Sequence, residues 1–322
     1  MKRNFVWFPI FFILFIASFV LSLSLGSADI SLNNLVNLFN GEISTKEQIL
    51  YNIRLPRTLV AALVGMSLAT SGAILQGIMK NPLADPHIIG ISSGAGLFGI
   101  FVLLAYPKAA HYVTPIAFIG AMGAAVLIYI LAWKGGIRPI RMILAGVAVS
   151  AFLGAGISAL LIFYSDRVQS ALMFMVGGLS ARSWPHVEII LPYAIIGVIF
   201  AFLGARTLNI MQLGDEAAKS LGVGVEKARI LLTATAALLA ASAVSVAGLL
   251  GFIGLIVPHG ARLLIGSDYK KLIPASAMLG ATTLIFSDTM ARTVFAPMEL
   301  PVGILTAVLG APFFLYLLRR EI

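Results

Sequence analysis

Cysteine is absent from this chain of 322 residues, and charged residues make up only 11% of it. Without cysteine, the chain can form no disulfide, no thiolate metal site and no cysteine-linked lipid anchor. An average soluble domain carries about 25% charged residues, so the shortage of charge is equally informative. No long polar stretch remains that could form a separate soluble domain, and we therefore expect one domain over residues 1–322.

Catalytic patterns are missing as well. No Gly-Lys dipeptide occurs, so the chain cannot build a Walker-type phosphate loop, and no His-Glu-x-x-His pattern marks a metalloprotease. We therefore expect no enzyme activity, no resident metal site and no cofactor. If the protein depends on ATP hydrolysis, another chain must perform it.

Apolar residues, in contrast, make up 60% of the chain and gather in long runs separated by short charged gaps. Runs of 19 residues or more cover residues 5–25, 59–79, 115–133, 142–164 and 187–205. A helix of about 20 apolar residues crosses a hydrocarbon core about 30 Å thick and satisfies its own backbone hydrogen bonds there. The pattern predicts an all-α integral membrane protein surrounded by membrane lipid.

The net charge of +9 does not indicate a nucleic-acid partner, because the basic residues lie at the ends of apolar runs rather than on one surface. We place Lys2 and Arg3 in the cytoplasm, and each span then carries the chain to the opposite side of the membrane. In this topology, fifteen of the 22 Lys and Arg residues lie on the cytoplasmic side. The seven outside are Lys46, Arg54, Arg57, Lys108, Arg167, Arg182 and Arg292. Both termini are then cytoplasmic, and ten spans lie near residues 5–26, 57–79, 88–106, 115–133, 142–164, 187–206, 229–250, 254–267, 272–290 and 302–318.

Two of these spans need comment. The eighth is short and contains Pro258, His259 and Arg262, which suits a broken helix buried by its neighbours. We assign no role to His259 and Arg262 beyond the structure of a helix end. The run that follows Met1 is longer than the apolar part of a signal peptide and many spans follow it, so we retain it as the first span.

A faint internal repeat is present at an offset of 176 residues. Gly72, Pro82 and Gly90 then fall on Gly248, Pro258 and Gly266. The first set starts in a span that runs inward and the second in a span that runs outward, as in an inverted-topology repeat of a transporter.

Small residues recur every four positions in two spans. They are Ala61, Gly65, Ala69, Ala73 and Gly77 in the second span, and Gly146, Ser150, Gly154 and Ser158 in the fifth. Residues four apart share a helix face, so each stripe lets a neighbouring backbone approach closely. Helix packing alone is the favoured explanation of such a stripe, and a narrow face beside a translocation path is the alternative.

Ionisable residues are almost missing from the spans. Only Asp288, Arg262 and His259 are candidates, and each lies near a span end. A proton or ion relay would place such groups in the middle of a span, so the pattern argues against an ion-coupled carrier.

Three polar segments stand out between the spans. The first joins Arg-Leu-Pro-Arg at 54–57 and Gln76 to Asn-Pro-Leu-Ala-Asp-Pro at 81–86 and Ile-Gly-Ile-Ser-Ser-Gly-Ala at 89–95. The second is Gly-Asp-Glu-Ala-Ala-Lys-Ser-Leu-Gly-Val at 214–223, where two acids and a later glycine predict a short helix with a charged first turn and a glycine stop. The third runs from Gly-Leu-Ile-Val-Pro-His at 254–259 through Arg262, Asp288 and Arg292 to Glu-Leu-Pro-Val-Gly at 299–303 and Gly-Ala-Pro-Phe at 310–313.

Together these segments resemble the FecCD-type permeases, which are membrane subunits of ABC importers for ferric siderophores, haem and cobalamin. The resemblance runs from Arg54 to the C-terminus in order and with ordinary spacing. It implies a type II ABC importer fold in the cell membrane of a prokaryote. It also implies a second permease subunit of the same or another sequence, two cytosolic ATP-binding subunits and an extracytoplasmic solute-binding protein.

The resemblance also implies roles for individual residues. Within the cytoplasmic loop 207–228 it assigns ATPase coupling to Asp215, Glu216, Ala217, Leu221 and Gly222. It assigns a gate at the cytoplasmic end of the path to Asn81 and Leu83, a gate at the outer end to a short helix within 168–178, and docking of the binding protein to Arg54, Arg57 and Arg292. As alternatives, Asn81 and Leu83 form a purely structural turn, and the arginines are interfacial residues whose head groups reach toward water. The stripe of Gly146, Ser150 and Gly154 is our candidate for the path itself.

We therefore expect a permease subunit that admits an iron(III)–siderophore complex, with haem or cobalamin as the alternative within the family. An ion-coupled secondary transporter is the alternative from another class.

Overall fold

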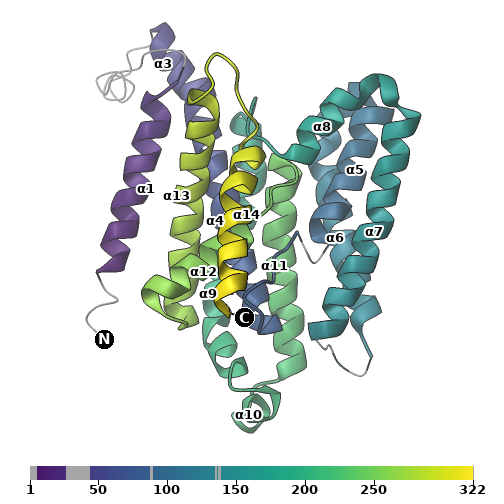
Figure 1. Cartoon of the computed structure of the whole chain (residues 1–322), viewed down its shortest axis with the longest axis vertical. Helices are drawn as coiled ribbons and strands as arrows, with labels where there is room; N and C mark the ends of the chain where they lie inside the picture. Colours follow the sequence, from purple (N-terminus) through teal and green to yellow (C-terminus); the bar gives the residue numbers. More distant parts are fainter. Residues whose placement is uncertain (1–5, 27–43, 88–89, 135, 137–138, 322) are drawn as a thin grey trace.

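The computed structural model describes residues 6–26, 44–87, 90–134, 136 and 139–321, and within these ranges the chain is helical and contains no sheet (Figure 1). The expected all-α class is thus confirmed. The ten predicted spans correspond to α1 (Trp7–Ser24), α4 (Leu55–Met79), α5 (Ile91–Ala105), α6 (Val113–Ala132), α7 (Pro139–Phe163), α9 (Trp184–Met211), α11 (Val225–Ala247), α12 (Ile253–Ile265), α13 (Tyr269–Thr293) and α14 (Val302–Glu321). Of the residues that support the predicted topology, Lys2, Arg3 and Arg138 lie outside the described ranges, as does Ile89 of the first polar segment.

Shorter helices connect them. They are α3 (Thr45–Ile49), the π-helical turn η2 (Leu50–Arg54), the 3-10 helices η3 (Pro107–Tyr112) and η4 (Ser165–Arg167), α8 (Val168–Val176) and α10 (Asp215–Ser220). The second span therefore continues a helix that already starts at Thr45, upstream of the predicted boundary. The expected short helices at 168–178 and 214–223 are present as α8 and α10.

Six helices in the described ranges are long and apolar enough to cross a membrane: 7–24, 45–79, 107–132, 139–163, 184–211 and 225–247. Helix α12, the eighth predicted span, has 13 residues. At 1.5 Å per residue it is about 20 Å long, which is too short to cross the hydrocarbon core alone. Phe252 before it and Gly266 after it have positive φ angles, and Pro258 and His259 within it are buried. The helix is thus sharply bounded and enclosed by its neighbours.

Helix α4 lies at the centre of the bundle and packs against α9, α11, α12 and α13. Its small residues permit these contacts. A Cβ added at Gly65 would overlap the backbone of Gly280 on α13, and one at Gly72 would overlap the backbone of Gly254 on α12. The predicted small-residue stripe of this span is therefore a helix-packing face.

The two ends of the bundle differ in what they present (Figure 1). Helix α10 lies at one end, and α1 begins and α14 finishes toward that same end. Helices α3 and α8 lie at the opposite end. We call these the α10 end and the α8 end. The start of α1, the finish of α14 and α10 thus share one side of the bundle, and the assignment of that side to the cytoplasm stays a prediction.

The 176-residue offset does not align equivalent positions. Gly72 lies inside α4, whereas Gly248 follows the last residue of α11. Pro82 lies between helices, whereas Pro258 lies inside α12. Glycine and proline occur at helix ends and close contacts in many places, so these three coincidences alone do not demonstrate a repeat. The inverted-topology repeat stays a prediction.

Candidate functional site

At the α8 end, Arg57 on α4 connects two carboxylates from distant parts of the chain. Its Nε and Nη2 donate to Asp288 on α13 at 2.9 and 3.0 Å, and its Nη1 donates to Glu299 at 2.8 Å. The side chains of Arg57 and Asp288 are 11% and 2% exposed, whereas that of Glu299 is 46% exposed. The network therefore begins in the bundle and reaches the surface through Glu299.

Glu299 lies in the connection between α13 and α14, outside the spans. Partial burial acts to raise the pKa of its carboxyl, but the hydrogen bond and positive charge of Arg57 outweigh burial, and the pKa is lowered overall. Ser180 also donates to this carboxylate at 3.2 Å. Glu299 is thus held as an anion by two neighbours.

Arg54 and Arg292 bind the end of α1. Arg54 Nη1 donates to the carbonyls of Leu23 and Ser24 at 2.7 and 2.8 Å. Arg292 donates through Nη1 to the carbonyl of Leu25 at 2.7 Å and through Nη2 to the carbonyl of Ser22. The last carbonyls of a helix have no intrahelical donors and carry partial negative charge, so the two guanidinium groups satisfy the C-terminus of α1.

All three predicted docking arginines therefore lie at one end of the bundle, and each is already engaged within the chain. Their role in docking a partner stays a prediction, and such docking would have to compete with these contacts. The contact with α1 could not be predicted from the residue pattern, because every residue has a backbone carbonyl.

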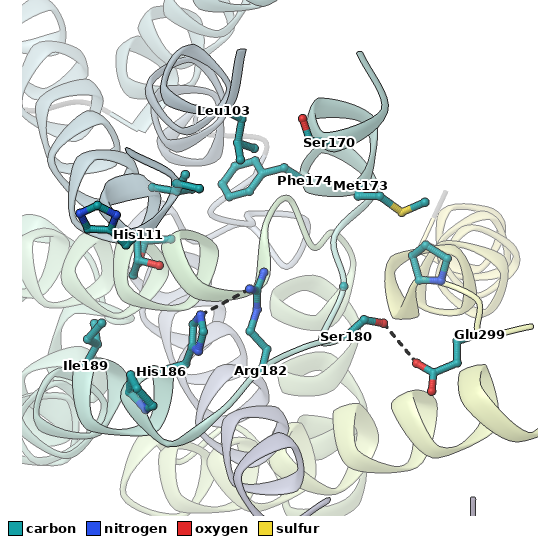
Figure 2. A pocket seen from close by; sticks show the side chains of 17 residues that line it. Leu103, His111, Ser170, Met173, Phe174, Ser180, Arg182, His186, Ile189 and Glu299 are labelled. Atoms are coloured by element: carbon teal, nitrogen blue, oxygen red, sulfur yellow. Dashed lines mark hydrogen bonds between the residues drawn. The ribbon is translucent and has the colours of Figure 1, made fainter. Parts of the chain in front are cut away.

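A cavity of about 650 Å³ opens at the α8 end beside this cluster (Figure 2). It lies between α8, η3, the first turn of α9 and the connection before α14, and is lined by Phe174, His111, His186 and Glu299, among others. Arg182 also lines it and lies within 3.4 Å of His186. Sequence analysis placed Arg182 outside but gave it no role. The predicted outer helix, α8, forms one wall of this cavity, and its gating role stays a prediction.

At the α10 end, the predicted coupling helix is fixed to the rest of the bundle by charge. Both carboxylate oxygens of Asp215 accept from Nη2 of Arg229 on α11 at 2.8 Å, and Lys80 Nζ at the end of α4 lies 4.0 Å from Asp215. Arg229 is buried. Gln212 just before α10 donates to the carbonyl of Gly77 at 2.9 Å. The loop is thereby tied to both α4 and α11.

The outer face of α10 is polar with an apolar edge. Glu216 forms an exposed ion pair with Lys219, whose pKa is raised first by the hydrogen bond that its Nζ donates to this glutamate and then by the glutamate's charge. Leu221 is 60% exposed. Gly222 has a φ of +81°, so the helix ends at a conformation that suits glycine. Ala217 is half-buried, while the neighbouring Ala218 is buried against the bundle.

The predicted inner turn follows α4. Asn81 Oδ1 accepts from the backbone N–H of Leu83 at 2.9 Å, and Oδ1 of the buried Asp85 accepts from the N–H of His87 at 2.7 Å. Asp85 lies against Gly254, where an added Cβ would crowd its carboxylate. The turn is therefore held by its own side chains and lies against α12, and its role as a gate stays a prediction.

Arg262 has a contact that sequence analysis missed. Its Nη1 donates to Gln76 Oε1 at 3.1 Å, and the amide nitrogen of Gln76 donates to the carbonyls of Gly254 and Leu255 at 3.3 and 3.1 Å. Gln76 and Arg262 thus join α4 to both ends of the short helix α12.

The candidate path residues on α7 divide into two groups. Gly146 and Ser150 lie against Gly90 at the start of α5, where an added Cβ would meet them. An added Cβ at Gly154 meets nothing within 4 Å. Helix packing therefore accounts for Gly146 and Ser150, and Gly154 faces open space; the path role of all three stays a prediction. Among the described residues, no group of three or more His, Asp or Glu side chains could hold a metal ion.

Comparison with known proteins gives consistent matches. The model of the FecCD transport family matches residues 14–320. The chain is 41% identical to the Fe(3+)-citrate import system permease protein YfmE of Bacillus subtilis, over 99% of this chain and 96% of the relative. It is 44% identical to the cobalamin import system permease protein BtuC of Halobacterium salinarum, over 88% and 76% of the two chains. A solved structure of an inward-facing metal-chelate type ABC transporter superimposes with a TM-score of 0.87 at 29% identity, covering 96% of this chain and 97% of that one.

Proposed function

This chain belongs to the FecCD transport family, and from that membership we propose that it passes an iron(III)–siderophore complex across the membrane. As a member it is a multi-pass permease subunit of an ABC importer and not itself an enzyme. Such a permease works with an ATPase and a solute-binding protein. We propose in addition which substrate it carries, which end of the bundle faces the cytoplasm, and which residues contact each partner.

The observation that carries the proposal is the placement of α10. This short helix lies at the end of the bundle where α1 begins and α14 finishes, opposite the α8-end cavity and the arginine cluster. Asp215 and Gln212 tie it to α11 and α4, so a force on α10 reaches helices that span the bundle. We assign the α10 end to the cytoplasm and the α8 end to the outside, in the cell membrane of a prokaryote, with both termini cytoplasmic.

ATPase docking rests on the exposed part of the same element. Leu221 is an exposed apolar side chain beside the charged face of Asp215 and Glu216, and an apolar anchor with charged neighbours suits a helix that enters a groove. Two ATP-binding subunits and a second permease copy, identical or related, complete the assembly. The exposed apolar face of α7, which includes Leu144, Val147 and Phe152, suits lipid or that second copy.

The binding protein docks at the α8 end in this proposal. Arg54, Arg57 and Arg292 supply three positive charges there against the carboxylates of Asp288 and Glu299, so the cluster keeps net positive charge. Glutamates on the lobes of a binding protein complement such a surface. Arg57 and Arg292 both lie beside the buried Asp288, so replacing either would also disturb the contact between α4 and α13. Arg54→Gln is therefore a cleaner test of docking than a substitution of Arg57 or Arg292. Co-purification of the ATPase checks that the variant is folded.

Iron chelates are the favoured substrate because the relative with the greatest coverage reported above is named for Fe(3+)-citrate. Haem or cobalamin is the alternative within the family, since a cobalamin permease is also similar over most of this chain. An ion-coupled carrier is disfavoured by the scarcity of ionisable side chains in the spans.

The test is transport into vesicles that contain the permease and its co-purified ATPase, with the binding protein added outside. We expect ATP-dependent uptake of radiolabelled iron as its siderophore complex, and none with the permease alone. Parallel assays with haem and cobalamin identify the substrate. Uptake that needs no ATPase and follows a proton gradient would overturn the proposal.

A further inference from the structure

Another cavity, of about 740 Å³, opens between α6, α9 and α11. Helices α6 and α9 meet toward the α8 end, where the ring centroids of Phe118 and Tyr193 lie 5.0 Å apart. Closer to the α10 end, Met122 of α6 and Leu203 of α9 both line the cavity, and α11 packs against both helices. We call this cavity the α11 groove.

The walls of the α11 groove are apolar and open to the surroundings of the bundle. Phe200 and Leu231 line it and are exposed. Thr235 also lines it, but its hydroxyl donates to the carbonyl of Leu231 at 2.8 Å and needs no partner in the groove. Gly204 lets α9 and α11 approach closely here, since an added Cβ would lie 2.6 Å from Leu232. In a membrane, lipid chains surround such a surface, so an apolar chain is its natural occupant.

The groove is about as deep as one leaflet of the bilayer. On α11 it extends from Gly224 to Leu238, which is about 21 Å at 1.5 Å per residue. Trp133 at the end of α6 is exposed, and such aromatic residues mark the membrane–water interface. Met122 lies about 16 Å from Trp133 along α6. Half of a hydrocarbon core of about 30 Å is about 15 Å, so the groove matches an acyl chain of a single leaflet.

Two basic side chains flank the end of the groove nearest α10. Arg206 follows Leu203 by three residues on α9, and Lys227 precedes Leu231 by four residues on α11, so each is a helical neighbour of a lining residue. A Cβ added at Gly224, which also lines the groove, would lie 4.0 Å from the Cβ of Lys227. Both basic side chains are exposed.

The carboxylates at this end are engaged by other groups. Their contacts are those of Asp215 and Glu226 with Arg229, of Glu216 with Lys219 and of Asp268 with Asn209. In the part of the chain that the structure describes, Arg206 and Lys227 form no ion pair. Two such cations beside an apolar groove complement an anionic headgroup that is joined to an acyl chain.

We propose that the α11 groove binds one anionic phospholipid, with an acyl chain in the groove and the phosphate of its headgroup beside Arg206 and Lys227. Apolar walls alone accept any lipid, so the two cations supply the preference for negative charge. The headgroup lies next to the connection between α10 and α11, because Gly222 and Gly224 line the same end of the groove. The inference goes beyond the proposed function, because it needs neither a substrate nor an assignment of the cytoplasmic side.

Lipid binding is measured by native mass spectrometry of the full-length permease, purified in a neutral detergent with its co-purifying partners. Phosphatidylglycerol and phosphatidylcholine with the same acyl chains are titrated separately. We expect saturable retention of phosphatidylglycerol, with an affinity about tenfold or more above that of phosphatidylcholine. The reason is that each Lys or Arg near an anionic headgroup contributes about a fivefold factor.

The double variant Arg206→Gln/Lys227→Gln should lose this preference and retain both lipids equally. Lys270→Gln/Lys271→Gln is the charge-matched control, since it removes two cations from α13 near the end of α9 but outside the groove. Ala234→Trp should weaken retention of both lipids, because Ala234 is exposed and lines the groove, and the larger side chain takes the place of the acyl chain. Ala234→Trp changes no charge, so it still decides the test if the double variant folds poorly.

Equal retention of the two lipids by wild type would overturn the inference. So would an equal loss of preference in the double variant and its control, since net charge alone would then explain it, or an unchanged phosphatidylglycerol affinity in Ala234→Trp. A co-purifying protein that Ala234→Trp displaces, with no lipid retained by wild type, would assign the groove to a protein partner and also overturn the inference. The measurement uses no ATP and no substrate, so a failure of the proposed function leaves its result unaffected.

Discussion

Arg57 and Asp288 form a buried two-point ion pair across 231 residues of sequence, with Nε–Oδ2 and Nη2–Oδ1 distances of 2.9 and 3.0 Å. The pair joins the central helix α4 to α13. Arg292, one turn further along α13, lies 3.8 Å from the same carboxylate and holds the end of α1. The carboxylate of Asp288 thus connects α13 directly to α4 through Arg57 and indirectly to α1 through Arg292.

Asp288→Asn should destabilise the protein strongly. It leaves Arg57 with only the partly exposed Glu299, and loss of one partner of a buried ion pair costs about 3–5 kcal/mol. Thermal unfolding in detergent measures the loss. Glu299→Gln is the control and should cost about 1 kcal/mol or less, because that side chain is 46% exposed. Equal melting temperatures for Asp288→Asn and wild type would show that the pair contributes nothing to stability.

The contribution of Glu299 to stability should depend on pH. Its folded-state pKa is lowered from the ordinary 4.5, so the contribution is present above pH 4.5 and is lost as the pH falls through the lowered value. The difference in melting temperature between wild type and Glu299→Gln should shrink over that acidic range. A difference that stays constant or grows on acidification would contradict the assignment.

Arg292→Met should loosen α1 without unfolding the bundle. The substitution removes donors from the carbonyls of Ser22 and Leu25, and these two groups then rely on water, while Arg54 still donates to the carbonyls of Leu23 and Ser24. Hydrogen exchange in the last turn of α1 should become faster, while exchange in α4 stays unchanged. Arg167→Met is a suitable control, because Arg167 makes no contact with α1 among the described residues.

Much of the fold could be predicted from the sequence, because apolar length and the charge asymmetry act locally. The run at 142–164 predicted α7 closely, and the acids and glycine at 215–222 predicted α10. The short α12 was recognised from Pro258 and the nearby charges. Helix starts were less accurate: the second span begins upstream at Thr45, since the polar residues of α3 carry no membrane signal.

The site was predicted only in part, because its contacts are distant in sequence. The family resemblance and the predicted outer position drew attention to Arg57, but nothing local in the sequence indicates that Asp288 is its partner. Arg54 and Arg292 bind backbone carbonyls, which every residue possesses. Arg182 could have been found only as one of the outer basic residues, since its contact with His186 depends on how the chain turns at Ala181.

Leu221→Glu should weaken attachment of the ATPase while leaving the permease folded. Leu221 is exposed at the end of α10, so a charge there disturbs an intermolecular contact rather than the bundle. Co-purification of the ATPase and ATP-driven uptake should both fall. Lys219→Ala on the same helix is the control, because its exposed ion pair with Glu216 contributes little. Wild-type recovery of the ATPase with Leu221→Glu would place docking elsewhere.

Gly154 and Gly65 allow stability to be separated from transport. Gly65→Ala should impair folding, because the added methyl group would overlap the backbone of Gly280 and push α4 away from α13. Gly154→Ala meets no atom within 4 Å and should leave the melting temperature unchanged. If Gly154 lines the path, Gly154→Leu should preserve folding and ATPase attachment yet reduce uptake of a bulky chelate, since the larger side chain occupies the open space. Unchanged uptake by a stable Gly154→Leu protein would exclude this face of α7 from the path.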